Sequence, residues 1–252
     1  MVNAGPDPKV DFVVAGAQKS GTRALSSFLF QHPEIGLVKP PRREAHFFDQ
    51  DKPRSRDGDF NEYHELFSED SLNRVAGDVT PIYVFNPAVW PRVKAYNRDM
   101  KVIVLLRDPV ERAYSQWAME FQKAKEHRNF GSALLNEARL FLSGHRHSPV
   151  FSYMQRGFYS GQIKRLYKHF PPDQCLILKS DDLRNRHDTT LKTIYRFLGV
   201  TEITPPEQKS VHTRKYDPMP KLLATLLRGL FTPDIRRLEK LLDWNCKDWR
   251  LL

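Results

Sequence analysis

One short segment of the chain combines the residue types that bind phosphate, namely Gly16, Ala17, Gln18, Lys19, Ser20, Gly21 and Thr22. Its two glycines let the backbone approach an anion closely, its lysine adds a positive charge, and its two hydroxyls can donate hydrogen bonds or cap a helix. The alternative is an ordinary strand-to-helix turn with a capping serine or threonine. The combination of glycines, lysine and hydroxyls favours phosphate binding.

The elements on either side of this loop favour the same function. Residues 12–15 form a short apolar run of the buried-strand type, and a helical pattern with Leu25, Phe28 and Leu29 on one face follows the loop. The N–H groups at a helix N-terminus have no partners within the helix, and the helix dipole favours negative charge there. The loop differs from that of nucleoside-triphosphatases, because Lys19 precedes the second glycine instead of following it.

The rest of the chain alternates between short apolar runs and helical patterns, which predicts a P-loop-like α/β fold. We expect a three-layer sandwich with a central parallel sheet flanked by helices. Further strands are expected at residues 75–79, 101–106 and 175–178, and helices at 110–125, 132–142, 153–169 and 189–198. Residues 1–252 are expected to form one domain, with its core at about 10–220.

Residues 221–252 have the pattern of two amphipathic helices broken at Thr232-Pro233. Five leucines recur in this tail at helical spacing, namely Leu222, Leu223, Leu226, Leu227 and Leu230. A basic amphipathic helix can lie on a membrane, but this stripe is more typical of a helix that packs on the core of its own protein.

The composition of the chain indicates which classes of protein and of binding partner are possible. The 252 residues carry a net charge of +10, and 40% of them are apolar, which is enough for a core and argues against global disorder. Cys175 and Cys246 are the only cysteines, and their separation indicates neither a metal site nor a required disulfide. The N-terminal residues do not resemble a signal peptide, and no apolar run reaches the length of a membrane span. We therefore expect a cytoplasmic protein without a transmembrane segment.

Three blocks of the sequence, residues 16–25, 43–49 and 103–115, resemble a known enzyme family. They are similar to the sulfotransferases that use 3′-phosphoadenosine-5′-phosphosulfate (PAPS), in the branch that modifies heparan sulfate and related glycans. In that family the first block is the 5′-phosphosulfate loop, the second contains the catalytic carboxylate of the 3-O-sulfotransferases, and the third binds the 3′-phosphate. A looser similarity extends over about residues 10–220. Three motifs in the family's order are more specific than any one of them.

The resemblance implies a PAPS site formed by Gln18, Lys19, Ser20, Gly21, Thr22, Arg23, Arg107 and Ser115. Arg107 follows the strand at 101–106, where a 3′-phosphate could bind, although an ion pair with Asp108 or Glu111 is the alternative. Arg214 and Lys215 lie in a late basic loop, and in the related glycan enzymes such a loop closes over the nucleotide. A solvated loop explains these two residues equally well. No metal is expected in this scheme.

Sulfuryl transfer needs a cation near the leaving phosphate and a base near the acceptor hydroxyl. Lys19 meets the first need, and Glu44 matches the carboxylate that the glycan enzymes use as base. His46 is the rival, because the cytosolic small-molecule sulfotransferases use a histidine. In an extended chain both side chains project to one side, so we expect His46 to orient Glu44 or line the cleft. Asp49 is expected to be structural.

The acceptor is less well specified. The cations near Glu44 are Lys39, Arg42, Arg43, Lys52, Arg54 and Arg56. They would suit an acidic or sulfated glycan, or they form a solvated basic loop. The glycan enzymes usually have a lysine before the Ser/Thr-Pro pair that follows the base segment, whereas this chain has Val79 before Thr80-Pro81. A cation at that point of the acceptor site is therefore not expected, and O- and N-sulfation both stay open, as does the oligomeric state.

Two other functional classes deserve comparison with this one. A P-loop kinase or nucleotide hydrolase is disfavoured by the loop spacing and because Arg107, and not an acid, ends the best strand. A non-catalytic polyanion-binding module would explain the positive charge but would leave three ordered motifs unexplained. We therefore expect an enzyme that binds a nucleotide and an anionic or carbohydrate-containing acceptor, and not nucleic acid.

Overall fold

The computed structural model of the protein describes residues 9–50, 59–144, 148, 150–207 and 217–250. The chain forms two compact units. The sheet unit comprises residues 1–17, 21–105 and 165–211, and the helical unit comprises residues 18–20, 106–164 and 212–252. The chain thus enters the helical unit for three residues in the middle of the phosphate loop and then returns to the sheet unit.

The sheet unit is built on five strands in the order β2-β3-β1-β4-β5. They are β1 (Phe12–Gly16), β2 (Ile35–Leu37), β3 (Val75–Val79), β4 (Lys101–Leu106) and β5 (Cys175–Lys179). β1 pairs in parallel with β3 and with β4, and β2 pairs in parallel with β3. Every residue of β1 is buried, as expected for a strand covered on both faces. The strands predicted at 75–79 and 101–106 are confirmed at those bounds.

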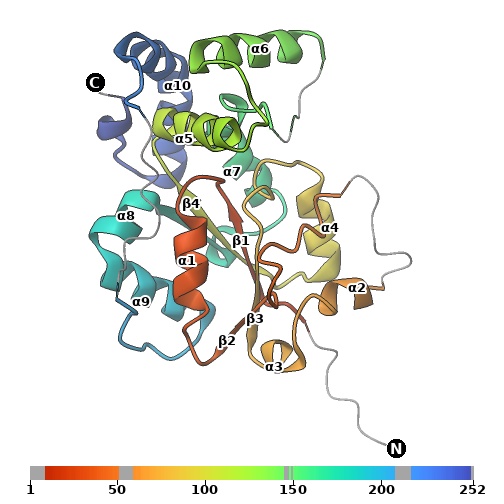
Figure 1. Ribbon diagram of the computed structural model, residues 1–252. Helices are drawn as coiled ribbons and strands as arrows, with labels where there is room; N and C mark the ends of the chain where they lie inside the picture. The colour runs from red at the N-terminus through yellow and green to blue at the C-terminus, as the bar shows by residue number, and fades with distance from the viewer. Residues whose placement is uncertain (1–8, 51–58, 145–147, 149, 208–216, 251–252) are drawn as a thin grey trace, which may run out of the picture. The chain divides into compact units, whose positions relative to one another are not determined.

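Helices cover both faces of this sheet (Figure 1). They are α1 (Thr22–Leu29), α2 (Asn61–His64), α3 (Glu69–Leu72), α4 (Val89–Tyr96), α8 (Ser180–Asn185) and α9 (His187–Leu198), with a 3₁₀ turn η2 (Pro172–Gln174) before β5. α1, α8 and α9 share one core with Phe12, Val14, Ile103 and Leu105 of the sheet, and α4 lies on the other side. Each large apolar side chain buried in this way contributes about 1.5–3 kcal/mol. The predicted three-layer α/β sandwich is confirmed.

The helical unit contains α5 (Pro109–Gln122), α6 (Phe130–Leu142), α7 (Tyr159–Tyr167, which ends in the sheet unit) and α10 (Lys221–Leu242), with the 3₁₀ turns η1 (Gln155–Gly157) and η3 (Lys247–Trp249). The start of α5 follows from its sequence. The Asp108 side chain caps the helix by accepting hydrogen bonds from the amides of Val110 (2.8 Å) and Glu111 (3.3 Å), and Pro109 occupies the first turn. Asp108 also forms an ion pair with Arg228 of α10 at 3.2 Å.

The helix predicted over 153–169 is wrong in its first part. The chain instead forms η1 and then α7, because Phe158 between them has φ −82° and ψ 84°, outside the helical region. The Phe158 ring packs against Phe231 of α10, with ring centroids 5.0 Å apart. This contact of the half-buried Phe158 ring accompanies the departure of the chain from the helical path.

The break predicted at Thr232-Pro233 is also wrong, because α10 continues through Pro233. A proline inside a helix loses one hydrogen bond and crowds the carbonyl four residues earlier, which here belongs to Gly229. The residues of α10 that are buried lie on one face on both sides of the proline, namely Leu227, Phe231, Asp234, Ile235 and Leu238. Tertiary packing of this face therefore outweighs the local cost of the proline.

The five leucines that were predicted to pack the C-terminal tail onto the core are only partly buried in α10. Leu227 is buried, whereas Leu222, Leu226 and Leu230 are 71%, 60% and 46% exposed. The docked face thus begins at Leu227 and continues toward the C-terminus. Within the described residues, no helix combines the length and the apolar character needed to cross a membrane. Cys175 and Cys246 are both buried, and they are not joined in a disulfide.

Candidate active site

The phosphate loop connects β1 to α1 through a tight backbone path. Gly21 is the N-cap of α1 and has φ +91°, a left-handed conformation that costs glycine little. A Cβ atom on Gly16 would lie 2.4 Å from Cγ1 of Val84, so only glycine fits at the end of β1. Lys19 also has positive φ, at 73°. A non-glycine residue adopts this conformation rarely, and such residues concentrate at functional sites.

The hydrogen-bonding groups of this loop fit an anionic ligand. No side chain caps the N-terminus of α1, so neither Ser20 nor Thr22 fills the capping role that the sequence allowed. The Ser20 side chain is fully buried, and its hydroxyl has no hydrogen-bond partner among the described residues. A buried hydroxyl without a partner costs about 1–3 kcal/mol, unless a ligand satisfies it. An anion at the start of α1 would accept from this hydroxyl and from the first N–H groups of the helix.

Gln18 contacts a buried cation that the sequence analysis did not identify. The Gln18 side-chain oxygen accepts a hydrogen bond from Nη1 of Arg156, in the same unit. Burial, followed by the neighbouring charge of Arg112, lowers the pKa of Arg156 to about 9. The two partners are 138 residues apart in the chain. No local pattern in the sequence could have paired them.

The predicted 3′-phosphate residues lie at the end of β4 and on α5. Arg107 donates two hydrogen bonds to Glu111, at 3.1 and 2.8 Å, and a third to the backbone oxygen of Lys19 at 3.4 Å. The ion pair with Glu111 was one of the two alternatives for Arg107, and it coexists with a direct contact to the phosphate loop. Ser115 is buried on α5. Arg214 and Lys215 lie outside the described residues.

The two candidate bases, Glu44 and His46, are bonded to each other. Nε2 of His46 lies 2.9 Å from Oε2 of Glu44, and its Nδ1 lies 2.8 Å from Oδ2 of Asp49. The hydrogen bond to Asp49, followed by that to Glu44, raises the pKa of His46 from 6.5 to about 10. His46 is therefore a cation at neutral pH and has no free lone pair with which to accept a proton. This arrangement leaves Glu44 as the group of the pair that can act as a base.

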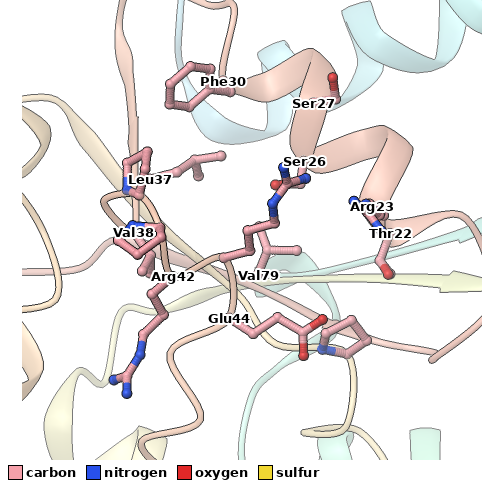
Figure 2. Close-up of a pocket in the computed structure, with 14 residues that line it drawn as sticks. Thr22, Arg23, Ser26, Ser27, Phe30, Leu37, Val38, Arg42, Glu44 and Val79 are labelled. Atoms are coloured by element: carbon pink, nitrogen blue, oxygen red, sulfur yellow. The ribbon is translucent and has the colours of Figure 1, made fainter. Parts of the chain in front are cut away.

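Glu44 lines a cavity of about 550 Å³ in the sheet unit. Figure 2 shows the side chains around it, among them Thr22 and Arg23 from the first turn of α1. The cavity therefore extends from the first turn of α1 to the candidate base. Pockets of this size bind small molecules or parts of larger ligands.

Arginine side chains and apolar side chains both line this cavity. Arg42 and Arg43 line it next to Glu44, and Val79 lines it from β3 with an apolar side chain. Val79 stands where the resemblance would place a lysine, so the side chain at this position carries no charge. Lys39 is exposed, whereas three other predicted cations, Lys52, Arg54 and Arg56, lie outside the described residues. Across the described part of the chain, no group of three or more His, Cys, Asp or Glu side chains is arranged to hold a metal ion.

Comparison with protein families decides between the classes considered above. A family model described as "Sulfotransferase domain" matches residues 9–222. The chain belongs to the sulfotransferase family. The resemblance seen in the three sequence blocks is thereby confirmed, and the matched range includes most of the sheet unit and part of the helical unit.

Curated relatives of this sulfotransferase include enzymes of the heparan sulfate branch. Human heparan sulfate glucosamine 3-O-sulfotransferase 3A1 is 30% identical over 203 residues, which are 81% of this chain and 47% of that protein. The mouse bifunctional heparan sulfate N-deacetylase/N-sulfotransferase 4 is 28% identical over 228 residues, which are 86% of this chain and 25% of that protein. The chain spans about half the length of the first of these relatives and less of the second.

Solved structures of sulfotransferases share the fold. A sulfotransferase from Alicyclobacillus acidocaldarius matches with a TM-score of 0.82 and 28% identity, covering 98% of this chain and 100% of that one. A mouse sulfotransferase complexed with PAP matches with a TM-score of 0.50 and 16% identity, covering 91% of this chain and 68% of that one. The second match supports the fold alone, because its identity is low.

Proposed function

We propose that this chain is a PAPS-dependent sulfotransferase that transfers a sulfuryl group to a hydroxyl of an anionic glycan, with Glu44 as general base. The observation that carries the proposal is the cavity lined both by the first turn of α1 and by Glu44. Sulfuryl transfer requires a site for the leaving phosphate and a base for the acceptor. A helix N-terminus and a carboxylate on one cavity supply these two requirements.

On the donor side, Lys19, the loop amides and the Ser20 hydroxyl bind the 5′-phosphosulfate. PAPS supplies an activated sulfuryl group and leaves as adenosine 3′,5′-bisphosphate (PAP). Arg107 and Ser115 bind the 3′-phosphate. The hydrogen bond from Arg107 to the backbone oxygen of Lys19 supports this assignment, because it places Arg107 beside the phosphate loop. These cationic groups neutralise the phosphates without a metal ion. Closure of Arg214 and Lys215 over the nucleotide stays a prediction.

In the transfer step, Glu44 accepts the proton of the acceptor hydroxyl as the acceptor oxygen attacks sulfur. The new oxygen–sulfur bond forms while the bond between sulfur and the bridging phosphate oxygen breaks, and the electron pair of that bond stays on the 5′-phosphate. Lys19 stabilises the negative charge that grows there. One hydroxyl and one PAPS thus give one sulfate ester, one PAP and one proton. Protonated His46, held by Asp49, orients Glu44 for this step.

On the acceptor side, three arginines of the cavity favour a negatively charged glycan. Arg42 and Arg43 flank Glu44, and Arg23 projects from the first turn of α1 onto the same cavity. We therefore assign Arg23 to the acceptor as well as to the donor, for which the sequence predicted it. The relatives named for heparan sulfate support a sulfated or carboxylated polysaccharide as acceptor.

The extent and location of the enzyme belong to the same proposal. The family match covers residues 9–222, which include parts of both units, so we propose that the two units act as one sulfotransferase domain. The predicted cytoplasmic location stays a prediction.

The proposal is tested by incubating the protein with radiolabelled PAPS and heparan sulfate and measuring label on the polysaccharide. We expect transfer without added magnesium, and an acceptor KM that rises with salt because the acceptor is held by surface arginines. The Glu44→Gln variant serves as the inactive reference. Transfer that requires magnesium, or no transfer to any of a panel of glycans, lipids and small alcohols, would overturn the proposed function.

A further inference from the structure

A buried carboxylate in β3 lies at the centre of a hydrogen-bond network beside the base segment, residues 44–49. Asp78 is fully buried and accepts three hydrogen bonds from hydroxyls. The donors are Thr80 at 2.6 Å, Tyr83 at 2.9 Å and Tyr63 at 3.1 Å. Burial raises the pKa of Asp78, and the three hydroxyls counteract this shift by stabilising its charged form.

Two of these hydroxyls also hold the backbone of the base segment. Oγ1 of Thr80 accepts from the amides of Ala45 (3.1 Å) and His46 (3.4 Å). The hydroxyl of Tyr83 accepts from the next two amides of the segment, at 3.1 and 3.4 Å. Four consecutive N–H groups, those of residues 45–48, are thus satisfied by two hydroxyls.

Asp78 determines which hydrogen bonds the hydroxyls of Thr80 and Tyr83 donate and which they accept. A hydroxyl has one proton to donate and lone pairs with which to accept. Because Thr80 and Tyr83 each give their proton to Asp78, their lone pairs are left for the amides of the base segment. Without the carboxylate, each proton would be free to turn toward those amides and to weaken the contacts. Coupled hydrogen bonds of this kind also strengthen one another in a buried site.

The base segment needs such support because its backbone is strained. His46 has φ +48°, in the left-handed region that residues other than glycine seldom adopt. A conformation of this kind costs about 1–3 kcal/mol and persists where the surroundings enforce it. It also directs the His46 ring toward both Glu44 and Asp49, which lie two and three residues away. The network therefore supports the backbone on which the candidate base is held.

We propose that Asp78, acting through Thr80 and Tyr83, is a positioning residue that fixes the orientation of Glu44 and His46 for sulfuryl transfer. The proposal rests on the proposed role of Glu44 as general base. Tyr63 of α2 is the internal control that the chain provides. It donates to the same carboxylate, while the amides of residues 45–48 are bonded to Thr80 and Tyr83.

The test compares variants that remove one hydroxyl of the network while keeping the shape of the side chain. Thr80→Val removes the hydroxyl that holds two amides of the base segment, Thr80→Ser restores it, and Tyr63→Phe removes a hydroxyl that reaches only the carboxylate. Asp78→Asn is added if it folds. For each protein we would measure kcat with saturating PAPS and heparan sulfate, PAP affinity by calorimetry, and the melting temperature.

We expect Thr80→Val to lower kcat about ten- to a hundredfold with PAP affinity unchanged, since small misplacements of a catalytic group have effects of this size. Thr80→Ser should recover most of the rate, and Tyr63→Phe should lose little of it despite a similar fall in melting temperature. The proposal fails if kcat follows melting temperature in all variants, or if Thr80→Val turns over normally.

A second readout separates this proposal from the proposed function. The imidazole nitrogen signals of His46, measured by NMR without substrate, report whether its ring stays paired with Glu44 and Asp49. Thr80→Val should shift these signals toward those of a free histidine, and Tyr63→Phe should leave them in place. Such a result in a protein that transfers no sulfuryl group would refute the proposed function but not the positioning role. Normal transfer with unshifted His46 signals in Thr80→Val would refute the positioning role alone.

Discussion

The base segment and the phosphate loop use their polar groups in contrasting ways. In the base segment, His46 is bonded to Glu44 and Asp49, and four successive amides are bonded to Thr80 and Tyr83. In the phosphate loop, residues 16–22, the helix N-terminus has no side-chain cap. The buried Ser20 hydroxyl has no partner in the described part of the chain. Most polar groups of the base segment are thus bonded within the protein, except for Oδ1 of Asp49, which is buried and has no partner among the described residues. In the phosphate loop, the Ser20 hydroxyl and the uncapped helix N-terminus are candidate donors to a ligand.

This difference corresponds to two kinds of task. A general base must be held in one orientation before the acceptor arrives, so protein–protein hydrogen bonds around it improve the rate. A site for a highly charged nucleotide binds its ligand more strongly when its hydrogen-bond donors are already in position and have no other partner. The free-energy cost of removing these donors from water is then part of folding and not of binding. The following predictions test whether the two regions differ in this way, from the largest expected effect to the smallest.

The base itself should give the largest effect. Glu44→Gln keeps the shape of the side chain but removes its basicity, so we expect kcat to fall by about a hundredfold to ten-thousandfold, with PAP affinity unchanged. Steady-state kinetics at saturating donor and acceptor measure the loss, and Glu65→Gln, at an exposed residue after α2, is the matched control. If Glu44→Gln stays active while His46→Ala is inactive, the base is His46.

The phosphate loop should give the next largest effect. Lys19→Ala removes the cation that stabilises charge on the leaving phosphate, and we expect kcat to fall about a hundredfold to a thousandfold at saturating PAPS. Lys168→Ala, at an exposed lysine of the sheet unit, controls for the change in net charge. Near-normal turnover of Lys19→Ala would mean that the loop is only a structural turn.

The unused hydroxyl of the loop gives a smaller but more specific test. Ser20→Ala should weaken PAP binding about tenfold, because a hydrogen bond to a charged group contributes about 1.5 kcal/mol or more. The stability of the free protein should not fall, because the hydroxyl has no hydrogen-bond partner among the residues that the structure describes. Ser68→Ala is the contrasting variant, because Ser68 caps α3 by accepting from Ser71 at 3.1 Å. It should lower the melting temperature and leave PAP affinity unchanged. The reverse pattern would contradict the comparison.

The smallest effect is a dependence of stability on pH in the base segment. His46 has its pKa raised to about 10 in the folded protein, above its ordinary value of 6.5. Its ion pairs therefore contribute fully below pH 6.5, and their contribution is lost as the pH rises through about 10. Urea unfolding should show that His46→Ala destabilises the protein at pH 6 and much less above pH 10. A difference that does not change with pH would mean that the pairing with Glu44 and Asp49 is not ionic.

The sequence was most informative where a single local signal decides the structure. β4 was predicted at its observed bounds because the residues after Lys101 form a short apolar run that a parallel sheet buries on both sides. β3 was also predicted at its observed bounds, although its sequence Val-Ala-Gly-Asp-Val includes the buried Asp78. β2 has only three residues, which are too few to predict a strand from their sequence. α4 was not predicted, because Pro91 in its first turn resembles a helix breaker in the sequence. α10 was divided at Pro233 because local propensity does not include the packing that carries the helix through it.

The same limit applies to the candidate site. The pairing of His46 with Glu44 followed from their spacing of two residues, whereas Asp49, expected to be structural, is the second partner of the His46 ring. Contacts across the fold could not be predicted. Arg156 reaches Gln18 across 138 residues, and Thr80, which accepts from the amide of Ala45, lies 35 residues from it. Each pair is formed only by the folded chain, and no local pattern in the sequence encodes it.

The central claim is that the chain binds the nucleotide of PAPS through the phosphate loop, in which the Ser20 hydroxyl has no partner among the described residues. Calorimetric titration of the protein with PAP in the absence of magnesium tests this claim most directly. Adenosine 5′-phosphate is the comparison ligand, because it lacks the 3′-phosphate assigned to Arg107 and Ser115. The account predicts tight, magnesium-independent binding of PAP and binding at least tenfold weaker for adenosine 5′-phosphate, since each lost charge-assisted contact weakens binding by about that factor. Equal affinity for the two nucleotides, or binding of PAP only when magnesium is present, would contradict it.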